Sequence, residues 1–150
     1  MDPQPASPRI LIIIPAYNES ASIVRVVADV RATVPEARVA VVDDGSSDDT
    51  AARARSAGAT VLRLPFNLGV GSAMQTGFLA ALEWGFDIAL QVDGDGQHPA
   101  GEIRKVIDRA KHPPAFSGIL SMQTRGNPVR KDLPLPVYDF GAFGSGVAQA

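Results

Sequence analysis

The sequence predicts an α/β fold with a mainly parallel sheet and flanking helices. Four short, mostly apolar runs alternate with four longer segments in which apolar residues recur at helical spacing. The first run, Ile10 to Ile14, contains only Ile and Leu, as expected of a strand buried on both faces of a parallel sheet. Each run is followed by Gly, Asp, Asn or Pro, residue types that favour turns.

The four predicted strands cover residues 9–14, 37–42, 60–64 and 88–92. Ser20 is expected to cap the first helix, because its hydroxyl can accept a hydrogen bond from the first helical turn. The apolar positions of this helix lie on one face: Ile23, Val26, Val27, Val30 and Val34.

The later helices are also bounded by residues that start or stop helices. Ser47 or Asp48 is expected to cap the second helix, which Gly58 closes. The third helix is predicted to follow residues 67–71 and to run to about Gly85. The fourth is predicted to run from Pro99 to about Lys111.

Composition divides the chain into three parts. Residues 1–8 carry three prolines and are expected to form a flexible leader, whereas residues 9–110 contain the whole predicted sheet and its helices. Residues 111–150 contain five prolines, five glycines and little periodicity, so we expect an irregular, poorly ordered tail.

Charge and cysteine content exclude several classes of function. A net charge of −2 with mixed signs offers no basic surface for nucleic acid. The chain has no cysteine, which excludes disulfides, thiolate metal sites and a cysteine nucleophile. The longest apolar run is too short for a transmembrane segment, and the amino-terminal residues do not resemble a signal peptide, so a cytoplasmic location is expected.

Two carboxylates, Asp93 and Asp95, follow the fourth predicted strand and are separated by Gly94. Carboxylate oxygens, together with phosphate oxygens of a substrate, are typical ligands of Mg²⁺ and Mn²⁺. The alternative is that Asp-Gly-Asp-Gly is simply a turn. A second observation favours a site: the clusters PAYNE, VDDGSS, NLGVG and VDGDGQH all follow strands, and ligands of open α/β sheets bind beyond the carboxyl ends of strands.

These four clusters, in this order, resemble the PxYNE, VDDGSxD, NxGxGxAxxxG and DxDxQHP motifs of family 2 glycosyltransferases. The similarity is to the amino-terminal, nucleotide-sugar-binding half of such enzymes, in particular those that transfer sugars to polyprenyl or dolichyl phosphate. It covers residues 9–110 and implies a nucleotide-diphospho-sugar transferase domain of the Rossmann-like GT-A type, incomplete at the carboxyl end.

The resemblance implies roles for individual residues. Pro15, Tyr17 and Glu19 would lie against the nucleotide, and Asp44 would hydrogen-bond the base or the ribose. Asp93 and Asp95 would be the DxD pair that binds a Mg²⁺ or Mn²⁺ ion bridging the diphosphate, with Asp95 a direct ligand. The implied donor-binding set also includes Asn18, Val42, Gly45, Gly94 and Gln97.

The resemblance implies transfer of a sugar from a nucleotide-diphospho-sugar to an acceptor, expected to be a polyprenyl phosphate at a membrane surface. It assigns no catalytic residue and does not distinguish UDP from GDP. An alternative hypothesis is a truncated or frameshifted remnant that at most binds nucleotide and metal, because the family pattern is lost after Ala110. Asn67, Gly69 and Gly71 either bind phosphate through helix amides or form a tight turn.

Overall fold

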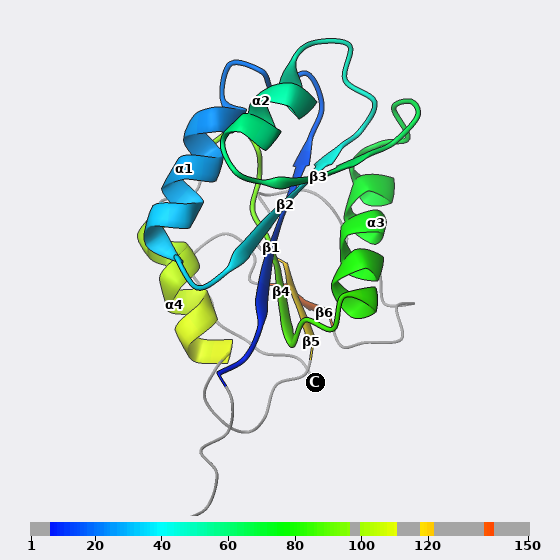
Figure 1. Cartoon of the computed structure of the whole chain (residues 1–150). Helices are drawn as coiled ribbons and strands as arrows, with labels where there is room; N and C mark the ends of the chain where they lie inside the picture. Colours follow the sequence, from blue (N-terminus) through cyan, green and yellow to red (C-terminus); the bar gives the residue numbers. More distant parts are fainter. Residues whose placement is uncertain (1–6, 97–99, 111–117, 122–136, 140–150) are drawn as a thin grey trace, which may run out of the picture.

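The computed structural model describes residues 7–96, 100–110, 118–121 and 137–139. Its strands form one sheet in the order β3-β2-β1-β4-β5-β6, and every neighbouring pair is parallel. The predicted parallel α/β architecture is therefore confirmed (Figure 1). The strands are β1 (Ile10–Ala16), β2 (Arg38–Asp43), β3 (Thr60–Arg63), β4 (Ile88–Gln91), β5 (Gly118–Ser121) and β6 (Val137–Asp139).

The helices cover both faces of this sheet. One face carries α1 (Ile23–Thr33), α2 (Thr50–Ser56) and α4 (Ala100–Ala110), and the other carries α3 (Val70–Glu83), as Figure 1 shows. None of the helices in the described residues is both long and apolar enough to cross a membrane.

Strand β1 lies at the centre of the core. Ile10, Ile12 and Ile14 face α1 and α4, whereas Leu11 and Ile13 face α3, and all five side chains are buried. Alternate residues of a strand point to opposite faces, so a strand covered on both faces needs apolar residues at every position. This requirement explains the uninterrupted Ile and Leu run.

Two predicted helix starts are wrong. The residue before α1 is Ser22, not Ser20, and the Ser22 hydroxyl donates to the Glu19 carboxylate instead of capping the helix. The residue before α2 is Asp49, which makes no side-chain cap hydrogen bond. Polar side chains before these helices bond neighbouring loops instead: Ser22 bonds the Gly94 carbonyl, and Asp48 bonds the Ser20 N–H. The predicted stop at Gly58 agrees with its left-handed φ of 91° after α2.

Two strands lie in the segment that was expected to be irregular. β5 pairs with β4, and β6 pairs with β5, so residues 118–121 and 137–139 extend the sheet. The prediction of an irregular tail is wrong for these residues, because runs of three or four residues are too short for a periodic pattern to be recognised. The rest of the tail and residues 1–6 of the leader lie outside the described residues.

The β1–α1 and β2–α2 loops are joined by side-chain hydrogen bonds. Asn18, whose φ is 53°, donates its backbone N–H to the Ser46 hydroxyl at 2.9 Å, and its Oδ1 accepts the Ser47 N–H at 2.9 Å. The Glu19 N–H donates to the Thr50 hydroxyl at 2.9 Å. These bonds satisfy backbone groups that no strand or helix pairs, and they hold the two loops in one arrangement.

Asp48 completes the connection between these two loops. Its Oδ2 accepts the Ser20 N–H at 3.2 Å, and its Oδ1 accepts both the Thr50 hydroxyl and, at 2.9 Å, the Thr50 N–H. The hydrogen bond from the Thr50 hydroxyl is the largest of the effects that lower the pKa of Asp48 from 3.8 to about 2.

A carboxyl group with a lowered pKa stabilises the fold above its unfolded pKa, and this contribution is lost as the pH falls through its folded pKa. The difference in unfolding free energy between the native chain and Asp48→Asn should therefore be greatest above about pH 4 and shrink toward pH 2. Denaturant titrations at several pH values measure it, and Asp49→Asn is the control for loss of an exposed carboxylate. A difference that is constant over this range would contradict the assignment.

A close contact between α3 and β1 provides a test of packing. A Cβ atom added to Gly77 would lie 2.4 Å from Cγ2 of Ile13, whereas nothing lies within 4 Å of a Cβ added to Gly71 in the same helix. Gly77→Val should lower the unfolding free energy by about 1–3 kcal/mol through overpacking. Gly71→Val is the matched control and should not. Equal thermal or denaturant stability of the two variants would show that α3 does not pack this closely.

Candidate functional site

The candidate site lies at the carboxyl ends of the strands, on both sides of β1. On one side Ala16 pairs with Asp43, and the Asp44 N–H donates to the Ala16 carbonyl at 2.9 Å. On the other side the Val92 N–H donates to the Ile13 carbonyl at 2.9 Å, just before Asp93. The chain leaving β1 runs toward β2, whereas the chain leaving the neighbouring β4 runs toward β5 in the opposite direction along the sheet, and such a switch point is where open α/β sheets bind ligands.

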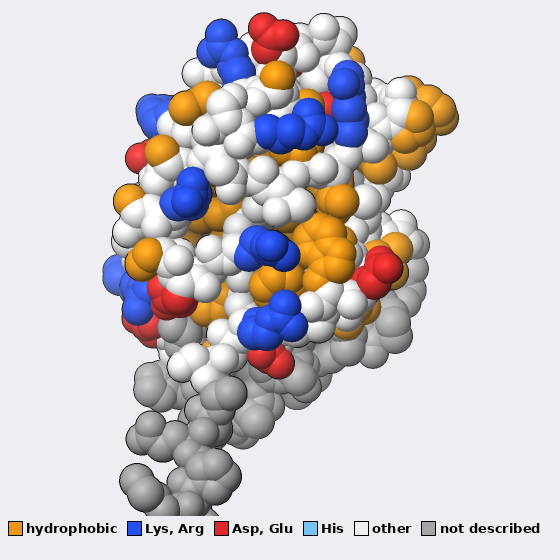
Figure 2. Space-filling model, in the orientation of Figure 1, with side chains coloured by type: hydrophobic (Ala, Val, Ile, Leu, Met, Phe, Trp, Pro, Cys, Tyr) orange, Lys and Arg blue, Asp and Glu red, His pale blue; other side chains and the backbone are white. Residues whose placement is uncertain are grey.

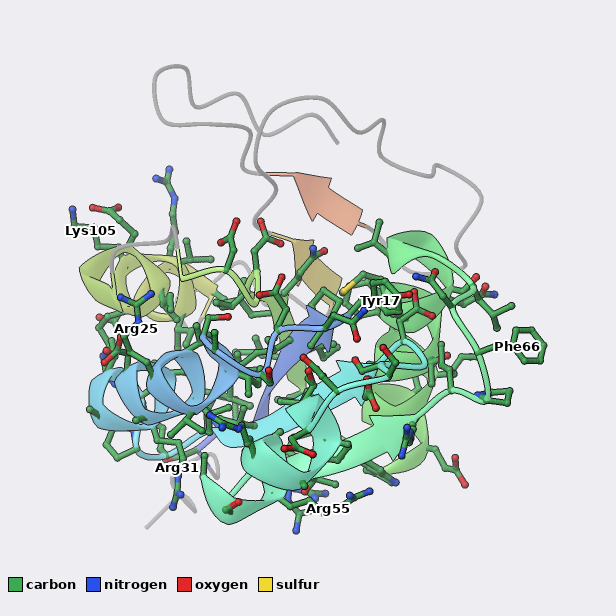
Figure 3. The ribbon with its side chains drawn as sticks, turned by 90° about the horizontal axis from the view of Figure 1, so that it is seen from above. Tyr17, Arg25, Arg31, Arg55, Phe66 and Lys105 are labelled. Carbon is green, nitrogen blue, oxygen red and sulfur yellow. The ribbon has the colours of Figure 1, made fainter. Side chains whose placement is uncertain are left out.

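A pocket of about 230 Å³ opens at this edge of the sheet. Tyr17 lies beside the end of β1 in the view from above (Figure 3), and its side chain is 46% exposed. Its ring offers a planar apolar surface next to polar groups, which suits stacking of an aromatic ligand. Three residues of the predicted donor-binding set are therefore found in one pocket, which is lined by Pro15, Ala16, Tyr17, Asp44, Asn67, Gly69, Val70 and Ala73.

Asp44 connects this pocket to the loop between β3 and α3. Its carboxylate is only 4% exposed, and its two oxygens accept the N–H groups of Leu68 and Gly69, each at 2.8 Å. Gly69 has a φ of 91°, a conformation that favours glycine. Each carboxylate oxygen can accept a second hydrogen bond, so Asp44 can hold the loop and still accept a bond from a ligand in the pocket.

Asp43, the neighbouring acid, has a different environment. Its side chain is fully buried, its Oδ1 accepts the Ser46 N–H at 3.0 Å, and its Oδ2 lies 3.2 Å from Nε of Arg63. Arg63 also donates from Nη2 to the Ser46 carbonyl at 2.9 Å. Asp43 therefore holds the β2–α2 loop in place from the buried end of β2. The bond comes from the Ser46 backbone N–H, which most residue types would supply, so the sequence carries no specific signal for this role.

Gly45 has a packing reason to be glycine. Its φ is 72°, and a Cβ atom at this position would lie 2.4 Å from the backbone carbonyl carbon of Phe66. The β2–α2 loop thus contacts the backbone of the β3–α3 loop.

Three other residues of the predicted donor-binding set do not line the pocket. The Asn18 side chain bonds the β2–α2 loop, and the Glu19 carboxylate accepts the Ser22 hydroxyl at 2.8 Å. The Val42 side chain is fully buried in the core beneath α3, so a contact with a ligand would have to come from its backbone.

The acidic loop after β4 packs against the end of β1. Asp93 is half-buried, and its Oδ1 accepts Nε2 of Gln91 at 3.1 Å, whereas Asp95 is exposed. The Gly94 carbonyl accepts the Ser22 hydroxyl at 3.0 Å, and a Cβ atom on Gly94 would lie 3.0 Å from the Pro15 carbonyl oxygen. This close approach favours glycine between the two acids. Gln97, also predicted to bind the donor, lies outside the described residues.

The residues of this loop fit a hard divalent cation whose coordination shell is completed by a bound ligand. Within the described ranges, no group of three or more His, Asp or Glu side chains is arranged to hold a metal ion. Asp93 and Asp95 supply oxygen atoms from two carboxylates. Mg²⁺ and similar ions commonly take one or two protein carboxylates and fill the other positions with substrate phosphates and water.

Comparison with known proteins gives the family. The model of the family described as "Glycosyl transferase family 2" matches residues 11–137. The chain is 35% identical over 108 residues to an undecaprenyl-phosphate mannosyltransferase of Micrococcus luteus. This alignment covers 69% of this chain and 44% of that protein. It is 33% identical over 115 residues to a polyprenol monophosphomannose synthase of Mycolicibacterium smegmatis, in an alignment that covers 71% of this chain and 43% of that protein.

A solved structure agrees with these sequence matches. The glucosyl-3-phosphoglycerate synthase of Mycobacterium tuberculosis, in complex with Mn²⁺, uridine-diphosphate and glucosyl-3-phosphoglycerate, superposes with a TM-score of 0.65 and 25% identity. The match covers 81% of this chain and 46% of that one.

These matches also correct the extent of the resemblance. The family match continues to residue 137, beyond Ala110, the predicted end of the resemblance, and it includes β5. The chain spans less than half the length of the two curated relatives. A family match over most of the sequence and the shared architecture lead to one conclusion: the chain belongs to glycosyl transferase family 2 and has the GT-A fold.

Proposed function

We propose that this chain is the donor-binding part of a glycosyltransferase that transfers a sugar from a nucleotide diphosphate to a polyprenyl phosphate. The observation that carries the proposal is the position of the Tyr17 pocket and the Asp93–Asp95 loop on either side of one strand end. The names of the relatives support the acceptor class, because one contains undecaprenyl-phosphate and the other contains polyprenol. The Mn²⁺ and uridine-diphosphate of the structural neighbour support the donor class.

Each part of the site has a chemical role in this proposal. The nucleotide base lies against Tyr17 and Pro15, and Asp44 accepts a hydrogen bond from the base or the ribose. Asp93 and Asp95 would hold a Mg²⁺ or Mn²⁺ ion, which when bound stabilises the negative charge on the departing diphosphate. A phosphate acceptor is already anionic, so it needs no general base from this chain.

Donor binding and sugar transfer are separate claims for this chain. Because it spans less than half the length of the two curated relatives, we assign donor binding to the chain and sugar transfer to the complete protein. The alternative is a chain that binds nucleotide and metal without transferring sugar. Both hypotheses predict donor binding, and an assay of sugar transfer to polyprenyl phosphate distinguishes them.

The metal assignment is tested by calorimetric titration of UDP-glucose and GDP-mannose with Mn²⁺ present. At least one donor should bind saturably, and Asp95→Ala should weaken its binding more than roughly tenfold, because a charged metal ligand is lost. Asp49→Ala removes an exposed acid outside this loop and should leave affinity unchanged. Equal affinity in the native chain and Asp95→Ala would rule out Asp95 as a ligand.

The role of Asp44 is tested by Asp44→Asn. Asparagine has one side-chain acceptor oxygen, so one of the two hydrogen bonds to the β3–α3 loop is lost. The unfolding free energy should fall by about 1–3 kcal/mol, and donor affinity should fall as well.

The matched control for Asp44→Asn is Asp87→Asn. Asp87 accepts the Arg9 N–H at 2.7 Å near the amino end of β1, at the opposite end of the strand from the pocket. Asparagine can still accept this single hydrogen bond, so Asp87→Asn removes a carboxylate charge away from the pocket and should leave donor affinity unchanged. If Asp44→Asn lowered stability and left donor affinity intact, Asp44 would serve the loop alone.

A further inference from the structure

The loop between β3 and α3, residues 64–69, exposes large apolar side chains at the edge of the candidate site. Phe66 is 62% exposed, the largest value among the exposed large hydrophobic side chains of the described residues, and Leu68 is 49% exposed. In the view from above, Phe66 points outward from the molecule (Figure 3). Neighbouring apolar side chains exposed together on a protein surface typically mark an interaction site.

The backbone of this loop is fixed while these side chains point outward. Both Asp44 oxygens accept loop amides, and the Leu64 N–H donates to the Asp43 carbonyl at 2.8 Å. Gly45 also packs closely against the Phe66 backbone. The exposure of Phe66 and Leu68 is therefore built into the fold.

The charged residues between Asp49 and Glu83 are all arginines. Residues 50–82, which form α2, β3, the loop and most of α3, contain no Asp or Glu and three arginines: Arg53, Arg55 and Arg63. All three are exposed. Figure 2 shows Lys and Arg side chains spread over the face that carries α2 and β3, with hydrophobic side chains projecting at its right-hand edge, near the start of α3 in Figure 1.

We propose that the β3–α3 loop docks on a bilayer containing anionic lipid, with Phe66 and Leu68 in the interface and the arginines near the lipid phosphates. Exposed apolar side chains next to exposed arginines match the chemistry of such a surface, and the two acids that contact this loop and Arg63, Asp44 and Asp43, are buried. Asn67 and Gly69 of the same loop line the pocket, so docking brings the pocket to the membrane. The inference rests on the proposed function, in which the acceptor is a lipid phosphate.

The test is flotation of the full chain, without donor or metal, with vesicles of phosphatidylcholine and phosphatidylglycerol. The chain should float with these vesicles, less with phosphatidylcholine alone, and less in about 1 M salt, where charges are screened beyond ~3 Å. Phe66→Ser should reduce binding at least roughly fivefold, because an aromatic side chain no longer enters the interface. The matched control Leu79→Ser, at a 58% exposed position of α3, should bind as the native chain does.

A fluorescence experiment tests insertion directly. In a Trp84→Phe background, Phe66→Trp should shift its emission to the blue when these vesicles are added, whereas Leu79→Trp should not. Equal shifts would overturn the assignment to this loop, as would flotation that Phe66→Ser leaves unchanged. A chain that dimerises in solution through Phe66 and does not float would identify a second copy as the occupant and overturn the proposal.

Donor titration in solution keeps this inference separate from the proposed function. The Phe66 side chain does not line the pocket, so Phe66→Ser should bind donor as the native chain does. Native donor binding without flotation would overturn membrane docking alone. Flotation without donor binding would support docking and count against the donor site.

Discussion

The structure depends on the burial of β1 on every side. β2 and β4 pair with its two edges, α1 and α4 cover one face, and α3 covers the other. Full burial of an Ile or Leu side chain is favourable by about 1.5–3 kcal/mol, so five consecutive buried residues hold this strand firmly in place. Its carboxyl end is consequently a fixed point, and both the Tyr17 pocket and the acidic loop after β4 are built against it.

Polar side chains transmit this fixed geometry to the loops. The side chains of Asp44, Asn18 and Asp48 each accept a backbone N–H of a neighbouring loop, and Asp43 accepts one within its own loop, so the three loops around the pocket hold one another in place. A buried carboxylate is costly unless it is hydrogen-bonded, which makes Asp43 and Asp44 strong constraints on the local backbone. A site arranged before the ligand arrives loses less conformational entropy on binding.

Sequence patterns predicted strands β1 to β4 and the edge at which the pocket opens, because full burial of β1 and the turn residues after each strand leave clear signals. They did not predict the starts of α1 and α2, since several polar residues compete at each one and tertiary contacts decide which bonds form. β5 and β6 were missed because their few residues carry no periodicity. The hydrogen bonds by which Asp44 holds the β3–α3 loop could not be predicted either, since its partners lie 24 and 25 residues away in the sequence.

The strand order has a consequence for how such a protein can diverge. The pocket is built from the β1–α1, β2–α2 and β3–α3 segments, whereas the two acids belong to the loop after β4, and within the described residues the segment after β1 contacts both. Under the proposed function, mutations in the β3–α3 segment would alter which nucleotide is preferred without disturbing the acidic pair. Ligand choice and charge neutralisation would then evolve on separate segments of one framework.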